Sequence, residues 1–523
     1  MIVRLVLFFL LLQSVATAQE TDVLHYRFAL NLHDAHDTIT GLASIQFVHR
    51  SDKREISFDL VGRQSDGKGM QVLWATKEGL ADNVGLAVKQ IGDKFFVTFP
   101  AARKGDTTSL LVHYKGIPAD GLIISKNKFG ERTFFADNWP NRAHHWIPCT
   151  DRPDDKASFE FLVTAPKQYK VVSNGLKIAE KAVGPATTLT HWKEATPQAT
   201  KVMVIGVARF AVKEYTQQPG GVSISAWVYQ RDSTKGFYDY GLTPEILQFF
   251  ADYIGPFPYQ KLANVQSTTI FGGMENASAI FYAESSVTGN RNQEDLMAHE
   301  IAHQWFGDAV SEKSFAHLWL SEGFADFLTN YYFEKKYGKA VAAERWKKSR
   351  EEVVGFAGHS PHPVVDSTTD LMSLLNPNSY NKGAWVLHML RSEVGDQTFQ
   401  KVIQTYYQQY KGSNAETSDL KTIAEKVSGR ELTPFFEQWL HRPGVPQLQV
   451  STKVQDGELT VFVKQHGKPY RLTLEADIIQ ADSEVVRKQF NLKDVNQVFK
   501  IPVKGSAVTL ALDPDVKLLY TIK

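Results

Sequence analysis

Two histidines four residues apart, with a glutamate directly after the first, are the residues in this sequence best suited to chemistry. They are His299, Glu300 and His303, in the stretch "MAHEIAHQWFGD" at 297–308. Successive residues of a helix turn by about 100°, so the two imidazoles would share one face and could bind one metal ion. Glu300 would lie beside that ion, within reach of a water molecule rather than of the ion. The pattern predicts a hydrolytic metal site.

A third ligand is expected because hydrolytic zinc sites use three protein ligands and leave one position for water. Glu322, in "HLWLSEGFADF", follows His303 after a gap of eighteen residues, enough chain to lay a second helix against the first. Alone, it would be interpreted as a solvated glutamate that stabilises a helix N-terminus. Beside two histidines, it is the obvious third ligand. We expect one Zn2+ per chain, held by His299, His303 and Glu322, although other divalent ions can bind such ligands in vitro.

Helix signals surround these residues. Asn292 begins a pair typical of an N-terminal cap, and Gly307 suits the position after a helix, so a helix is predicted over 293–306. A second helix is expected to begin close to Glu322 and to end near Gly338. Two such helices would bring all three ligands together.

The chain changes character twice, which predicts a multidomain α+β protein. Short alternating apolar runs separated by Asp, Gly and Pro predict an all-β domain over 19–215. Helical patterns then dominate an α-rich domain over 216–441. "RPGVP", at 442–446, suits a linker, and β-type runs return over 447–523 as a small C-terminal β-sandwich.

Residues 1–18 have the pattern of a secretory signal peptide. A basic start, the apolar run "LVLFFLLL" and the small-residue end Ala16-Thr17-Ala18 predict cleavage before Gln19. The apolar run is shorter than the roughly 20 residues that a membrane-spanning helix needs. We expect an exported protein, periplasmic or extracellular, with no integral membrane association.

Charge and cysteine content narrow the possible partners. The 523 residues include 58 basic and 57 acidic side chains, a balance that offers no strong field for nucleic acid or an anionic membrane. Cys149 is the single cysteine, so no intrachain disulfide can form.

Three motifs together resemble the aminopeptidase N and leukotriene hydrolase family of gluzincin zinc metallopeptidases. They are "HEIAH" followed after eighteen residues by Glu322, "GGMEN" at 272–276, and "SYNKG" at 379–383, which is similar to the family's Tyr-x-Lys-Gly. The resemblance implies a saddle-like N-terminal all-β domain, a thermolysin-like catalytic domain and a small C-terminal β-sandwich.

The resemblance also implies roles for the residues of "GGMEN". Glu275 would bind the free α-ammonium of a peptide, so that one residue is removed from the N-terminus. Gly272 and Gly273 would let a strand edge approach the substrate backbone, where a Cβ would obstruct it. Met274 and Asn276 complete this substrate-binding segment. Without the zinc motif, the same letters would describe an ordinary turn with an exposed glutamate.

Two further roles come from the resemblance. Tyr380, expected to open a helix that runs to about Gly395, would donate to the oxyanion that forms when water attacks the carbonyl. Glu300 would act as the general base.

One position departs from the family. Many relatives have a Gln or Glu that helps to bind the substrate amine at the position of Trp139. Either an aromatic wall replaces that contact or Asn138 provides it. Trp139 and Trp146 suggest a first side-chain pocket with aromatic walls.

The prediction is therefore a zinc-dependent aminopeptidase acting on peptides with a free N-terminus. Two alternatives stay open. A zinc endopeptidase could use the same scaffold, but Glu275 argues against it because an endopeptidase meets no free amine at the cut. A non-catalytic binding protein should have lost a ligand, Glu300 or Tyr380, and this chain keeps them all.

Overall fold

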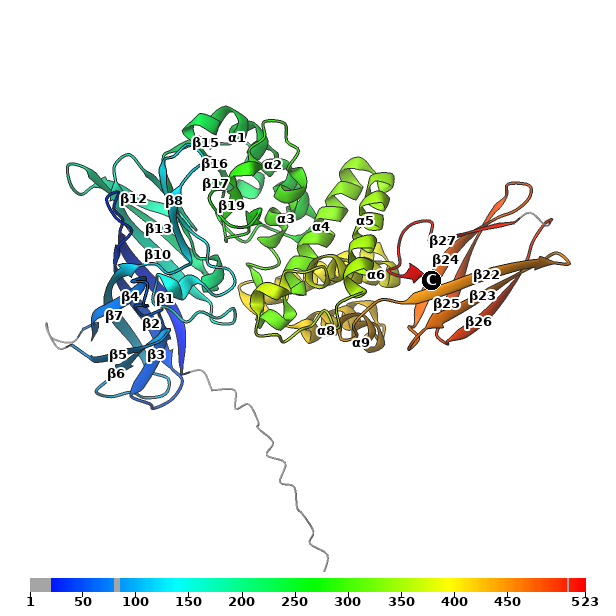
Figure 1. Cartoon of the computed structure of the whole chain (residues 1–523), viewed down its shortest axis with the longest axis horizontal. Coiled ribbons are helices and arrows are strands. Elements are labelled where there is room, and N and C mark those ends of the chain that lie inside the picture. Colours follow the sequence, from blue (N-terminus) through cyan, green and yellow to red (C-terminus); the bar gives the residue numbers. More distant parts are fainter. Residues whose placement is uncertain (1–19, 80–84, 506–507) are drawn as a thin grey trace, which may run out of the picture.

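Three lobes follow one another along the long axis of the protein, as its computed structural model shows (Figure 1). The structure describes residues 20–79, 85–505 and 508–523, so the predicted signal peptide lies outside the described residues. We call the three lobes the N-terminal lobe (20–208), the central lobe (210–440) and the C-terminal lobe (447–523). The predicted multidomain α+β architecture is confirmed.

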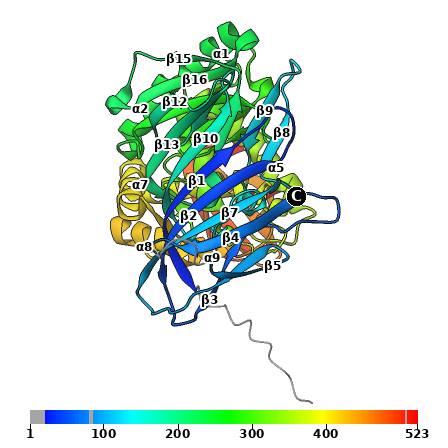
Figure 2. The ribbon, with the colours of Figure 1, turned by 90° about the vertical axis from the view of Figure 1, so that its left-hand side faces the viewer.

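The N-terminal lobe is built from three sheets. Strands such as β2 and β10 alternate strictly between buried and less buried residues, as expected for sheets with one face on a core. Figure 2 shows the central strands of the largest sheet side by side. In sheet order, the seven-stranded sheet contains β12 (Leu176–Ala182), β13 (Thr187–Gln198), β10 (Ala157–Pro166), β1 (Thr21–Asn31), β2 (Ile39–His49), β7 (Thr107–Ile117) and β4 (Gly69–Lys77). A four-stranded sheet contains β11 (Lys170–Ser173), β14 (Ile205–Ala208), β9 (Arg132–Ala136) and β8 (Leu122–Lys126). A three-stranded sheet contains β3 (Glu55–Asp59), β6 (Lys94–Thr98) and β5 (Ala87–Ile91).

A five-stranded sheet joins the N-terminal and central lobes. Its order is β15 (Phe210–Glu214), β16 (Ser223–Tyr229), β17 (Lys261–Ser267), β19 (Ala279–Ala283) and β18 (Gly273–Met274). Alternate residues of one strand belong to different cores: Ile280 packs with the helices, whereas Phe281 packs with the N-terminal lobe. Burial on both faces explains why β19, in the interior of this sheet, is an almost continuous apolar run. The short strand β18 forms one edge of the sheet.

Helices make up the rest of the central lobe. In chain order they are α1 (Ser233–Asp239), α2 (Thr243–Ile254), α3 (Glu294–His303), α4 (Trp319–Tyr337), α5 (Lys339–Ala357), α6 (Gly383–Val394), α7 (Asp396–Tyr410), α8 (Thr417–Ser428) and α9 (Thr433–Leu440). A two-stranded sheet of β20 (Val310–Glu312) and β21 (Ser413–Ala415) lies among them. None of the helices in the described part of the chain has the length and apolarity needed to cross a membrane.

The C-terminal lobe consists of two sheets, as predicted. One contains β26 (Asn496–Pro502), β23 (Glu458–His466), β22 (Gln447–Gln455) and β28 (Thr521–Ile522). The other contains β25 (Val485–Leu492), β24 (Leu472–Ile479) and β27 (Thr509–Leu512). The lobe is docked on the helices: His388 Nε2 lies 3.0 Å from the carbonyl oxygen of Val516.

Two local predictions are wrong. The helix expected over 293–306 ends at His303, because the next residues form a wider turn with i→i−5 bonds, such as Asp308 N to His303 O at 3.1 Å. Its N-terminus has no side-chain cap, so Asn292 does not cap it.

Candidate metal centre and its cleft

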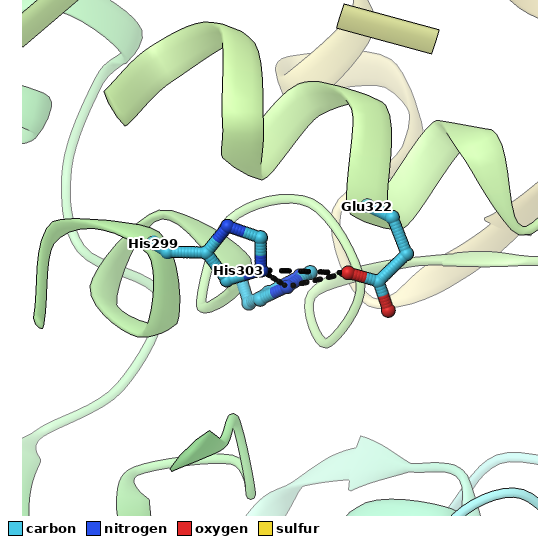
Figure 3. A group of neighbouring side chains, drawn as sticks. All are labelled: His299, His303 and Glu322. Atoms are coloured by element: carbon cyan, nitrogen blue, oxygen red, sulfur yellow. Dashed lines mark hydrogen bonds and ion pairs between the residues drawn. The ribbon is translucent and has the colours of Figure 1, made fainter. Parts of the chain in front are cut away.

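The three predicted ligands meet where α3 crosses α4 (Figure 3). His299 Nε2 and His303 Nε2 are 3.0 Å apart, and Glu322 Oε2 lies 3.4 Å from the first and 3.2 Å from the second. A tetrahedral zinc ion with bonds of about 2.0–2.2 Å holds its ligand atoms about 3.3–3.6 Å apart. The three atoms therefore lie close to the spacing that zinc needs.

The other ring nitrogen of each histidine has a partner, which fixes the orientation of the imidazole. His299 Nδ1 lies 2.9 Å from Asp326 Oδ1, on α4 one turn after Glu322. His303 Nδ1 lies 3.2 Å from the carbonyl oxygen of Phe306 and 3.1 Å from Ser321 Oγ. Sequence reasoning missed Asp326 and Ser321, although their spacing from Glu322 on one helix was a usable signal.

The charges around His299, His303 and Glu322 favour a cation between these three side chains. Burial alone would lower the pKa of His303, but Glu322 and Glu275 outweigh it and raise that pKa to about 9. Burial raises the pKa of Glu322, but His303 and His299 hold it well below its usual range. A site where carboxylates attract a cation this strongly suits a divalent metal.

Glu300 lies next to the ligands and is buried. Burial raises its pKa to about 7, although both histidines oppose the shift. A Cβ on Gly273 would lie 2.3 Å from Glu300 Oε1. A glycine at position 273 therefore leaves room for the side chain of Glu300. This reason differs from the predicted one, which was the close approach of a substrate backbone. At Gly272, by contrast, a Cβ would meet only Leu296 Cδ1, at 4.0 Å.

A cleft of about 620 Å³ opens onto this group. Nine of the ten predicted site residues line it, all except Asn276: His299, His303, Glu322, Glu300, Tyr380, Gly272, Gly273, Met274 and Glu275. Strand β18 lies along it as a sheet edge, and such edges can pair with an extended peptide. The ring of Tyr380, in a single π-helical turn before α6, stacks 6.0 Å from the ring of His299.

Glu275 follows β18 directly and is 5% exposed. Its Oε1 is buried and has no hydrogen-bond partner among the described residues. Burial raises the pKa of this carboxyl, and His303 and Lys201 oppose the shift. Asn276 is fully buried and does not line the cleft. The cleft is therefore lined by a carboxyl that has one unpartnered oxygen and lies close to the metal ligand His303.

The open question about Trp139 is answered by its packing. Trp139 lines the cleft and packs edge-on against Phe271, with ring centroids 6.0 Å apart. Asn138 points away: its Nδ2 donates to the carbonyl oxygens of Thr200 and Met203. Trp146 does not line the cleft, and its Nε1 donates to Asn138 Oδ1. An aromatic wall made by Trp139, without Trp146, stands at this position.

Two groups of residues could hold a metal within the described chain. The first is His299, His303 and Glu322, and the second is Glu275, Glu300 and His303. The first offers two imidazoles and one carboxylate, each imidazole with its own outer partner, which is the ligand set and support that hydrolytic zinc sites use. Of the two groups, the first is therefore the better candidate for a metal position.

Comparison with known proteins agrees with this geometry. The model of the peptidase family M1 domain matches residues 238–439, and that of the peptidase M1 N-terminal domain matches 23–202. Together the two matches cover well over half of the chain. The chain belongs to the M1 peptidase family. The first match contains the whole candidate metal site, and the second contains Trp139 and Lys201.

Several named relatives of this M1 family member are aminopeptidases. A probable aminopeptidase 2 from Sulfurisphaera tokodaii is 29% identical over 461 residues, which are 82% of this chain and 58% of that protein. Aminopeptidase M1-C from Oryza sativa subsp. japonica is 29% identical over 332 residues, or 61% of this chain and 38% of that protein. Glutamyl aminopeptidase from Sus scrofa is 28% identical over 330 residues, or 60% and 35%. The M1 chain thus spans less than two thirds of the length of these relatives.

A solved structure shares the fold. The crystal structure of a mutant M1 zinc metallopeptidase from Deinococcus radiodurans has a TM-score of 0.68 and 23% identity, over 81% of this chain and 94% of that one. At 23% identity, this likeness shows a shared fold.

Proposed function

We propose that this M1 family member is a zinc-dependent aminopeptidase that removes the N-terminal residue of peptides. The observation that carries the proposal is Glu275: its buried carboxyl has an unpartnered oxygen beside a ligand set suited to zinc, in one cleft. A buried carboxylate without a partner is costly unless a cation joins it, and the α-ammonium of a peptide is such a cation.

His299, His303 and Glu322 would hold the zinc ion. When bound there, zinc supplies the Lewis acidity that peptide hydrolysis needs. Glu300 accepts the proton of the attacking water on its carboxylate and passes it to the leaving amine. A pKa of about 7 suits both steps, since the group can then accept and donate a proton near neutral pH.

The remaining residues orient the peptide and stabilise charge. The hydroxyl of Tyr380 donates a hydrogen bond to the oxyanion that forms on the scissile carbonyl. Met274 and the two glycines before it place the edge of β18 along the substrate backbone. Glu275 holds the α-ammonium at a fixed distance from the three ligands, so that the first peptide bond is the one placed for cleavage.

The test compares one fluorogenic leucine amide with its N-acetylated form. We expect cleavage of the free amine only, loss of activity on chelation, and recovery when zinc is restored. The Glu275→Gln variant should lose about a hundredfold in kcat/KM on the free amine, because a buried charge pair is removed. Glu352→Gln is the matched control, since Glu352 also lines the cleft but is exposed and accepts a bond from Asn381 Nδ2.

The same assay separates the alternatives. Equal cleavage of the acetylated substrate would remove Glu275 from its role and favour an endopeptidase. No cleavage across several first residues, with zinc bound at one ion per chain, would favour a non-catalytic binding protein.

A further inference from the structure

The turn that carries Tyr380 is fastened to the segment that connects the central and C-terminal lobes. Tyr380 lies in the π-helical turn Asn378–Lys382, two residues before Lys382. Lys382 is fully buried, and its Nζ donates to the carbonyl oxygens of Gly444 at 2.8 Å and of Arg442 at 3.2 Å. Sixty residues separate Lys382 from Arg442 in the chain. The contact therefore exists only in the folded protein.

The other end of the turn reaches the same segment through a loop. We call residues 440–446 the junction. Asn378 Nδ2 donates to the carbonyl oxygen of His362 at 2.9 Å. Two residues further along that loop, Val364 N donates to the carbonyl oxygen of Leu440 at 3.0 Å. Both ends of the turn are thus linked to the junction by hydrogen bonds, directly at one end and through the loop at the other.

The junction is itself fixed on the C-terminal lobe. The guanidinium group of Arg442 lies 3.8 Å from the ring centroid of Tyr470 and donates to the carbonyl oxygen of Pro469 at 3.2 Å. Thr521 N donates to the carbonyl oxygen of Pro446 at 3.0 Å. This lobe lies at the end of the molecule away from the N-terminal lobe (Figure 1), and none of its described residues lines the cleft. Any influence of the lobe on the cleft must pass through contacts such as these.

The conformation of the turn makes such fastening important. A π-helical turn is rare and holds one residue more than an α-helical turn, so a change between the two would redirect the Tyr380 side chain. The ring of Tyr380 now stacks 6.0 Å from the ring of His299. A buried ammonium group without acceptors is costly, and Lys382 directs its hydrogen bonds to the junction. The turn and the junction are therefore held in a fixed relation.

We propose that Lys382 is a positioning residue for Tyr380: by holding the π-helical turn on the junction, it keeps the Tyr380 hydroxyl where it can donate to the oxyanion. A donor stabilises the transition state best when it is fixed before the charge develops. The inference rests on the role proposed for Tyr380 in peptide hydrolysis. It makes the junction with the C-terminal lobe a support of the catalytic cleft.

The experiment is a double-mutant cycle of Lys382→Met and Tyr380→Phe, measured on leucine amide hydrolysis by the zinc-loaded full chain. Tyr380→Phe removes the donor and should lower kcat about a hundredfold. Lys382→Met keeps a long side chain without donors and should lower kcat about tenfold when Tyr380 is present. In the Tyr380→Phe background it should have no further effect, a coupling of about 1.4 kcal/mol. KM and zinc content should stay close to wild type.

A change on the junction side gives a second test. Gly444 has a φ of +80°, and a Cβ there would meet no atom within 4 Å. Gly444→Ala therefore strains the backbone that presents the carbonyl oxygen to Lys382, without a steric clash. It should lower kcat about threefold, again only when Tyr380 is present. This variant decides the question if Lys382→Met does not fold.

Lys261→Met is the matched control. Lys261 is also buried, and its Nζ donates to the carbonyl oxygen of Ser173, on β11 of the N-terminal lobe, at 2.5 Å. Burial lowers the pKa of Lys261 to about 7, and burial together with Arg442 lowers that of Lys382 to about 7. Any loss of kcat in Lys261→Met should be the same with and without Tyr380.

The outcomes distinguish this inference from the proposed function. A wild-type protein that cleaves no amide would remove the proposed function, and the inference with it. If the wild type is active and Tyr380→Phe keeps its full kcat, the role of Tyr380 fails and Lys382 has nothing to position. If Tyr380→Phe is impaired and Lys382→Met lowers kcat equally in both backgrounds, or not at all, Lys382 has no positioning role. The same coupling in Lys261→Met would also overturn the inference.

Discussion

The two ends of the cleft are built in different ways. At the metal end, His299, His303 and Glu322 come from two consecutive helices, and Asp326 supports them from one of the same helices. At the other end, which we call the amine end after the role proposed for Glu275, the cleft is lined by elements that are far apart in the chain, with Trp139 contributed by another lobe. One end is local in sequence, and the other depends on how the lobes dock.

This difference separates two kinds of change. A substitution at the metal end should lower zinc binding or the rate of the chemical step for any substrate. A substitution at the amine end should weaken the preference for a free amine and leave zinc binding intact. The following variants test that separation, from the largest expected effect to the smallest.

Glu300→Gln should have the largest effect. The amide keeps the shape of the side chain but cannot accept a proton, so kcat should fall about a thousandfold. Zinc content, measured by atomic absorption, should remain one ion per chain. An active variant would mean that another group is the base.

Gly273→Ala should lower kcat by about a hundredfold, because the new Cβ would displace the carboxylate of Glu300. Gly272→Ala is the control at the adjacent residue, where a Cβ meets no atom closer than 4.0 Å. Steady-state kinetics on both variants, with circular dichroism to check the fold, make the comparison. Equal losses would show that the substrate, rather than Glu300, needs these glycines.

Asp326→Asn should weaken zinc binding by about 10- to 100-fold, since outer partners of histidine ligands have effects of that size. Competition with a chelator measures the change. Asp295→Asn is a suitable control, because Asp295 also lines the cleft but pairs with Arg345. Unchanged zinc affinity in Asp326→Asn would mean that the contact with Asp326 does not orient His299 for the metal.

Trp139→Phe should have the smallest effect. The smaller ring widens the amine end, so the ratio of kcat/KM for a large over a small first residue should rise about threefold. A panel of amino acid amides measures this ratio. A fall in zinc content instead would break the distinction between the two ends, since Trp139 belongs to the amine end.

Much of the metal end could be predicted from the sequence. The spacing of His299 and His303 places both side chains on one face of a helix. The eighteen residues between His303 and Glu322 are enough for the chain to turn back and lay a second helix against the first. The end of α3 could not be predicted, because the wider turn after His303 depends on Gly307, whose Cβ would lie 2.5 Å from Ser321 Oγ on another element. Local patterns cannot include that contact.

The amine end was only partly predictable. The motif pointed to Glu275, but the sequence could not decide between Trp139 and Asn138, because both are adjacent and either side chain could have faced the cleft. The structure decided it by giving Asn138 internal hydrogen bonds.

By itself, the sequence determined the order of β, α and β regions and the residues suited to bind a metal, because helix and strand periodicity fix which side chains share a face. Only the tertiary structure decided what surrounds Glu275. Trp139, which lines the same cleft, is more than a hundred residues from Glu275 and comes from another lobe. Contacts that depend on such docking have no local signal, so they appear only when the chain is folded.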